Sequence, residues 1–170
     1  ISSFLQKEKG INKDKSETIA QISNGNLNKA IQLCQIETEE YPPLKYFQKW
    51  MQICYKANLK ELAKWTDEIA KNGRENQKEF LQYSLKLIRD CLLVNTLNES
   101  LLKTDKEETI FVRNFAPFIH GENSVSIFEK TEKAIKNIER NANPKILFYE
   151  LSLQMMRLLK VKRKLAKKTE

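Results

Sequence analysis

The chain has 170 residues, 41% of them hydrophobic and 31% charged, with only four Gly and four Pro. This composition is typical of helix bundles and excludes a disordered chain or a sheet protein. No apolar run approaches the length of a membrane span and no signal peptide is present, so we expect a soluble, cytoplasmic protein. Because the chain begins with Ile1 and lacks a cap or turn before its first helix-like piece, we expect a fragment of a longer protein.

The formal net charge of +8 is concentrated at the C-terminus. Seven basic residues and one acid lie from position 157 onward, which leaves only +2 for positions 1–156. Two interpretations are open: a solvated helix end, where cations favour the negative pole of the helix dipole, or a segment that steers the chain to an anionic partner. The candidate basic tail comprises Arg157, Lys160, Lys162, Arg163, Lys164, Lys167 and Lys168.

Two short helices are expected at the start of the chain. Positions 14–23 carry apolar residues at helical spacing. Gly25 permits a turn into a second helix over 26–37, because glycine adopts backbone conformations that other residues avoid. Both helices are too short to bury a large core by themselves, so we assign them to a small helical piece.

A charged, proline-containing segment then interrupts the helical pattern. Three glutamates precede Pro42-Pro43, and neither proline nor the residue before it suits a helix interior. The separate apolar stripes on the two sides of this segment indicate separate cores. We therefore predict one domain over 1–38 and a larger one over 39–170.

Three helices are expected after this boundary. The first, over 44–56, has a continuous apolar stripe formed by Phe47, Trp50, Met51 and Cys54. The second follows the cap residue Asn58 and ends before Gly73, which suits the left-handed position past a helix end. The third, over 74–95, has so broad an apolar face that we expect a central helix with several neighbours.

The last third of the sequence predicts three more helices. A segment resembling a capping box, 104–107, precedes a helix over 110–118. A helix over 124–141 follows, with its inward face formed by Phe128, Ile135 and Ile138. Asn143 and Pro144 then open the last helix, since cap and proline are favoured at helix starts. No alternating stretch of strand length occurs, and the predicted fold is an all-α helical bundle.

The sequence contains no arrangement typical of a catalytic or metal centre. Cys34, Cys54 and Cys91 are widely spaced among apolar residues, which favours reduced core cysteines over disulfides or metal ligands. His120 is the only histidine, and its polar turn predicts a surface imidazole with no nucleophile beside it. We therefore expect no enzyme activity, no metal and no cofactor.

Three segments carry a resemblance to one family. The segment Gly25-Asn26-Leu27-Asn28-Lys29-Ala30-Ile31 resembles the Gly-x-x-Arg-x-Ala-Leu element found late in the lid of AAA+ clamp-loader subunits. Positions 73–83 resemble the start of the long collar helix in these subunits, and 138–147 resemble their final helix pair. The order of the segments, over nearly the whole chain, is similar to the δ′ family of bacterial DNA polymerase III.

The resemblance implies the end of a lid over 1–38 and a helical collar over 39–170. In active members the arginine of the first element reaches the nucleotide phosphates, whereas here that position is Asn28, followed by Lys29. The chain contains no Gly-x-x-x-x-Gly-Lys-Ser/Thr loop and no Ser-Arg-Cys element. The fragment is therefore expected to bind no ATP, although the full-length protein would belong to a DNA-directed DNA polymerase holoenzyme.

The resemblance also implies partners. A collar joins its subunit to the δ and γ/τ subunits so that the sliding clamp is loaded during DNA replication. The clamp and DNA are contacted only through the whole complex, and no membrane is involved. Two helix regions carry more apolar residues than one core-facing stripe needs, and they are candidate subunit contacts. Their positions are Tyr83, Leu87, Asp90, Tyr149, Leu153 and Met156. Two alternatives stay open, that these positions fill a thick core, and that the chain is a nucleic-acid-binding helical domain whose tail binds in a salt-dependent way.

Overall fold

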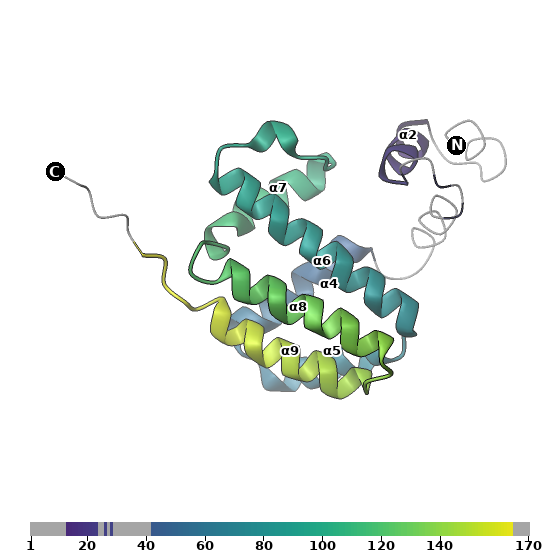
Figure 1. Cartoon of the computed structure of the whole chain (residues 1–170), viewed down its shortest axis with the longest axis vertical. Coiled ribbons are helices and arrows are strands. Elements are labelled where there is room, and N and C mark those ends of the chain that lie inside the picture. The colour runs from purple at the N-terminus through teal and green to yellow at the C-terminus, as the bar shows by residue number, and fades with distance from the viewer. Residues whose placement is uncertain (1–12, 24–25, 27, 29–41, 165–170) are drawn as a thin grey trace. The chain divides into compact units, whose positions relative to one another are not determined.

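The computed structural model of the chain describes residues 13–23, 26, 28 and 42–164 (Figure 1). These residues form α-helices, two short 3-10 helices and connecting turns, and none of them lies in a strand. The all-α prediction is thus confirmed for this part of the chain. The helices are α2 (Lys13–Ile22), α4 (Pro43–Lys56), α5 (Leu59–Ala70), α6 (Arg74–Asn95), η1 (Glu99–Leu101), α7 (Lys106–Phe115), η2 (Ala116–Phe118), α8 (Ser124–Glu139) and α9 (Pro144–Leu158).

The chain divides into two compact units, 1–46 and 47–170. In the first unit, α2 confirms the predicted helix over 14–23 and buries Ile19. The predicted boundary between 38 and 39 and most of the predicted helix over 26–37 lie outside the described residues, so both stay predictions.

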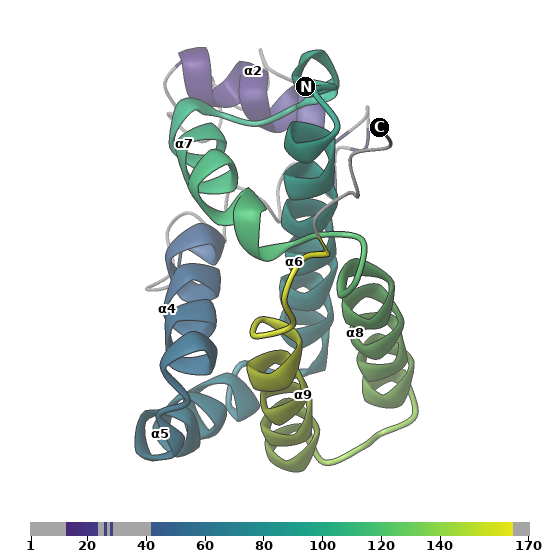
Figure 2. The ribbon, with the colours of Figure 1, turned by 90° about the vertical axis from the view of Figure 1, so that its left-hand side faces the viewer.

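The second unit is built around α6, its longest described helix (Figure 2). Helix α6 packs against α7 and η2 and also against α8, while α9 packs against both α8 and α5. A helix with neighbours on several sides needs a broad apolar face. The prediction of a central helix over 74–95 is confirmed, and its buried apolar side chains are Phe80, Leu81, Leu87, Ile88 and Cys91.

Aromatic rings form the centre of this core. The rings of Trp50 and Trp65 stack with centroids 5.3 Å apart and an angle of 2° between their planes. Phe80 lies 5.6 Å from Trp50, and Phe148 lies 5.8 Å from Trp65. The indole Nε1–H of Trp50 donates to the hydroxyl of Ser152 at 2.8 Å, which supplies the partner that a buried indole needs. The four apolar residues predicted to line the helix over 44–56 are all buried.

Two local predictions are wrong in register. The cap of α7 is Asp105, whose carboxylate accepts a hydrogen bond from the N–H of Glu108 at 2.8 Å, and the helix starts at 106 instead of 110. Helix α8 buries Ile127 and leaves Phe128 half-buried. Its inward face also includes Thr131, whose hydroxyl donates to a backbone carbonyl within the helix and so lies in the core without an unsatisfied polar atom.

Three of the described helices end in the same backbone motif. Ala57, Leu97 and Asn141 have left-handed φ angles of 52°, 58° and 64°. In each case the N–H of the following residue bonds to the carbonyl five residues before it, as in a Schellman motif. Asparagine tolerates this conformation, whereas a leucine there is strained.

We expect Leu97→Gly to stabilise the protein. The left-handed backbone costs leucine about 1–2 kcal/mol, and the 90% exposed side chain gives little burial in return. After the greater entropy of glycine in the unfolded chain is subtracted, a gain of about 0.5–1 kcal/mol should remain. Thermal denaturation should show a Tm higher by about 2–4 °C. The matched control is Leu101→Gly, at an exposed site with no positive φ, and its Tm should stay the same or fall. A lower Tm for Leu97→Gly would contradict the argument.

Candidate partner-binding surfaces

The six candidate interface residues divide equally between core and surface. Leu87, Asp90 and Met156 are buried within the second unit. Tyr83 on α6 and Tyr149 and Leu153 on α9 are half-buried and keep part of their surface accessible. The first three therefore fill the core, and only the second three present area to a partner without a rearrangement. The subunit interface itself stays a prediction.

Tyr83 also belongs to a polar network that joins α6 to α7. Its hydroxyl donates to the carboxylate of Glu108 at 2.6 Å, and Lys86 Nζ lies 2.6 Å from the same carboxylate. Lys86 is also 3.8 Å from the carboxylate of Asp90. Burial, followed by the negative charge of Glu108, raises the pKa of Tyr83. Its hydroxyl is therefore a neutral donor that holds the two helices together, and only its ring is available to a partner.

We expect Asp90→Asn to raise stability near neutral pH. Burial raises the pKa of the Asp90 carboxyl. The positive charge of Lys86 opposes this rise, and the negative charge of Glu108 adds to it. A carboxyl with a raised pKa in the folded state favours folding while protonated, and that contribution is lost as the pH rises. The asparagine variant avoids this loss, so its Tm should exceed that of the wild type near about pH 7. The two should converge as the pH falls below the ordinary Asp pKa of about 4, where Asp90 is protonated in the folded and the unfolded state alike.

Thermal denaturation across this pH range checks the expectation. Asp67→Asn is the matched control, since Asp67 is 2.6 Å from Lys145 but half-exposed, and such pairs contribute only about 0–1 kcal/mol. Its Tm should not rise at any pH. If Asp90→Asn melts below the wild type at neutral pH, the ion pair with Lys86 outweighs the cost of burial.

His120 is buried, and the expectation of a surface imidazole is wrong. Its Nδ1 lies 3.1 Å from the carboxylate of Glu122 and its Nε2 lies 3.0 Å from the carbonyl oxygen of Val161. Both ring nitrogens thus face an oxygen acceptor, and a ring nitrogen bonds to such a partner when it carries the N–H. Desolvation acts to raise the pKa of the Glu122 carboxyl. Hydrogen bonds from the backbone of Glu122, from His120 and from the backbone of Lys164 outweigh it, and the pKa of Glu122 is lowered. His120 thus connects the turn before α8 to the segment after α9.

Asn123 completes this connection. Its side chain is fully buried, its Oδ1 accepts from the N–H of His120 at 2.9 Å, and its Nδ2 donates to the carbonyl oxygens of Phe118 and Leu158 at 2.8 and 3.0 Å. We call His120, Glu122 and Asn123 the C-terminal clasp. The sequence predicted only a turn here, because an asparagine before a helix is usually its cap, whereas this side chain makes no cap hydrogen bond to α8.

The basic tail begins at this clasp. Helix α9 ends at Leu158 and residues 161–164 are not helical, so the helix dipole accounts only for the first basic residues. Among the described residues, none of the tail's side chains forms an ion pair. Its five members within the described range are all exposed, namely Arg157, Lys160, Lys162, Arg163 and Lys164. Lys167 and Lys168 lie outside that range.

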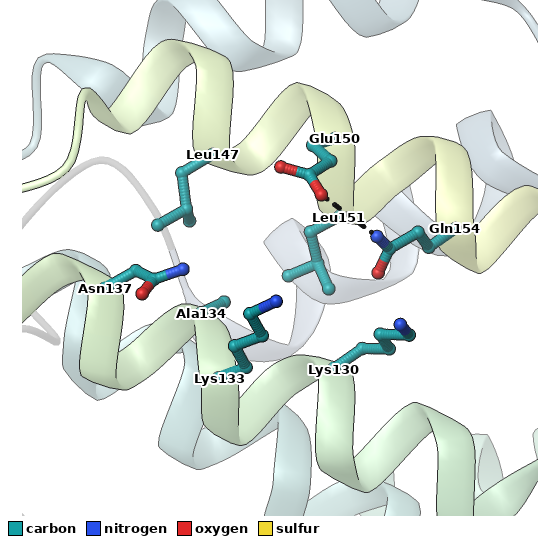
Figure 3. A pocket seen from close by; sticks show the side chains of 8 residues that line it. All are labelled: Lys130, Lys133, Ala134, Asn137, Leu147, Glu150, Leu151 and Gln154. Carbon is teal, nitrogen blue, oxygen red and sulfur yellow. Dashed lines mark hydrogen bonds between the residues drawn. The ribbon is translucent and has the colours of Figure 1, made fainter.

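A narrow groove of about 80 Å³ lies between α8 and α9 (Figure 3). Lys130, Lys133, Ala134 and Asn137 line it from α8, and Leu147, Glu150, Leu151 and Gln154 line it from α9. Gln154 donates to Glu150 at 3.2 Å along its edge. Pockets for small molecules have volumes of roughly 300–1,000 Å³, so this groove has room for a few water molecules but not for a nucleotide.

Two of the three cysteines are free and buried, as predicted, and Cys34 lies outside the described residues. Burial raises the pKa of Cys54 and of Cys91 to about 12, which keeps both thiols neutral and unreactive. Asn28 is exposed, while Lys29 is not among the described residues. In the part of the chain that the structure describes, no group of three or more His, Cys, Asp or Glu side chains could hold a metal ion.

Within the same ranges, no helix is both long enough and apolar enough to cross a bilayer. Comparison of the whole chain with known proteins adds no relative. No protein-family model, no curated protein and no solved structure matches it.

Proposed function

We propose that this chain is a non-catalytic assembly module of a clamp loader of the δ′ type. The segment over 1–38 would be the end of the AAA+ lid, and 39–170 would be the helical collar. The collar would join its subunit to the δ and γ/τ subunits through helix packing, and so hold the loader together while the sliding clamp is loaded onto DNA. The module itself would need neither nucleotide nor metal.

The observation that carries the proposal is where the resembling segments fall in the fold. The segment over 73–83 begins with Gly73, the N-cap of α6, whose φ of 75° and ψ of 158° favour glycine. The segment therefore starts the central helix, as the start of a long collar helix would.

The second segment, over 138–147, falls on the turn between α8 and α9. Asn141 takes the left-handed position that ends α8, and the side chain of Asn143 accepts from the N–H of Ile146 at 3.2 Å to cap α9. Each asparagine of the Asn-Ala-Asn turn therefore has its own structural task. This arrangement supports the likeness to the final helix pair of a collar.

Apolar surface on the second unit is also compatible with an assembly role. Leu153 and Tyr149 are half-buried on α9, and Ile146 at the start of the same helix is 67% exposed. Interfaces between subunits have apolar, often aromatic, centres. We therefore place the test on α9.

The test is complex formation with the δ and γ/τ collars of the same organism, measured by analytical ultracentrifugation. Leu153→Glu should weaken the complex at least tenfold, because a carboxylate would be buried without a partner. Gln154→Glu is the matched control, since it adds the same charge at the next, equally half-buried position, and it should change affinity less than twofold. Circular dichroism must show both variants folded.

Salt separates this proposal from its alternative. A complex held by apolar helix faces should survive about 0.5 M salt, where charge interactions are screened to about 4 Å or less. The absence of a complex with either collar, or equal losses in the two variants, would reject the assembly role for this surface.

A further inference from the structure

We propose that the chain carries a binding strip for the phosphate backbone of nucleic acid, fixed to the end of the helical bundle by the C-terminal clasp. The inference is independent of the assembly role and adds a direct contact that the collar resemblance does not imply. We call the strip's members the basic strip. They are Arg157, Lys160, Lys162, Arg163 and Lys164.

The charge of the basic strip is not neutralised by the rest of the described protein. No acidic residue occurs in the sequence between Glu150 and Glu170. Some surface cations elsewhere in the second unit do have carboxylate partners, as in the pairs Lys49–Glu68 at 3.1 Å and Arg113–Glu99 at 2.8 Å. Since the strip's five exposed cations make no such pair among the described residues, their charge is available to an external anion.

The backbone of the strip is held in place although its side chains are exposed. Asn123 donates to the carbonyl of Leu158, and Nε2 of His120 lies 3.0 Å from the carbonyl oxygen of Val161. Two buried side chains, Asn123 and His120, therefore tie the backbone at the start of the strip to the turn before α8. Fixing the segment before binding lowers the entropy cost of ordering it on a ligand.

The chemistry of the strip favours nucleic acid over a membrane surface. Amphipathic segments that lie in a bilayer interface insert an apolar face among the lipid headgroups, whereas a segment without such a face binds anionic lipid through charge alone. Among the strip's residues 160–164 the only apolar side chain is Val161, which is 37% exposed. Lysine and arginine contacts to phosphates carry no base specificity, so we expect binding that is independent of sequence and strongly dependent on salt.

The experiment measures fluorescence anisotropy of a labelled DNA duplex with the full 170-residue chain over a salt series. The test variant changes Lys160, Lys162, Arg163 and Lys164 to Gln. The matched control changes four exposed lysines of α4, α5 and the following turn to Gln, at 56, 60, 64 and 71. Both variants lose the same charge, so they differ only in where it is lost.

The strip variant should bind duplex DNA at least tenfold more weakly near 50 mM salt. The slope of the logarithm of its binding constant against the logarithm of the salt concentration should be smaller by about 3–4, because each of the four lost phosphate contacts contributes roughly 0.9. The control should lose less than twofold, and both variants should still bind the loader collars if the assembly role holds. Equal losses in both variants, or no binding by the wild type at low salt, would overturn the proposal. Equal affinity for phosphatidylserine vesicles would assign the strip to membranes instead and overturn it as well.

Discussion

Replacing Trp50 with alanine should lower the free energy of unfolding by about 3–5 kcal/mol, the usual cost of removing a large aromatic side chain from a core. Trp50 is fully buried, stacks on Trp65 and contacts Phe47 and Phe80. Its loss would leave a cavity between these three rings and remove the N–H that the hydroxyl of Ser152 accepts. Since the free energy of unfolding of a domain is typically about 5–15 kcal/mol in total, this single change would remove a large fraction of it.

Urea denaturation followed by far-UV circular dichroism measures this loss, and two further variants separate its causes. Ser152→Ala removes the acceptor of the indole N–H together with the bond that the hydroxyl donates to the carbonyl of Phe148. It should cost about 1–3 kcal/mol, chiefly the penalty for leaving the buried indole donor unsatisfied. Tyr55→Ala removes an aromatic ring that is 52% exposed and should cost far less than Trp50→Ala. If Trp50→Ala and Tyr55→Ala were equally stable, the stacked pair would not be the centre of the core.

Helix positions were predictable from the sequence wherever a local signal fixes them. Asn58 and Asn143 cap α5 and α9 through hydrogen bonds to N–H groups three residues later, and both helices were predicted to start there. Helix α6 has the bounds that its apolar periodicity predicts, 74–95. Such signals act within a few residues of the chain, which is why the sequence alone reveals them.

Register within a helix was less predictable. Thr104 and Asp105 are both competent caps, and their order in the sequence does not show which one starts α7. On α8 the large ring of Phe128 suggested an inward position, yet the packed face contains Thr131 and Ala134 and accommodates small side chains. The size of the neighbouring helices' side chains decides this choice, and that information is not local.

The C-terminal clasp could not be predicted at all. Asn123 and His120 find their partners at Leu158 and Val161, 35 and 41 positions further along the chain. No periodicity links a polar turn to carbonyl groups so distant in sequence. The same holds for the network around Glu108, which accepts from Tyr83 25 positions earlier. Apolar periodicity likewise does not separate residues that fill a thick core from residues that remain accessible, and three of the six candidate interface residues are buried.

Asn123→Ala should destabilise the protein by about 2–4 kcal/mol. The side chain of Asn123 satisfies three buried or half-buried backbone groups, and each lost hydrogen bond costs about 0.5–1.5 kcal/mol or more. The cost should also be local, since two of the three bonds hold the turn before α8 and the third holds the end of α9. Trypsin should then cleave faster within 157–164 than in the wild type, under conditions where the rest of the bundle stays folded.

Two further variants identify which bonds matter. Asn123→Asp keeps the acceptor for the N–H of His120 but turns a buried carboxylate oxygen toward the carbonyl oxygens of Phe118 and Leu158, so it should destabilise the protein at least as much as Asn123→Ala. Asn114→Ala, at an exposed position of α7, should stay within about 0.5 kcal/mol of wild type. Urea denaturation gives the stabilities, and tryptic peptide mapping gives the cleavage rates. An Asn123→Ala protein with unchanged cleavage at 157–164 would show that the basic strip is held without the clasp, and its ordered attachment to the bundle would need another cause.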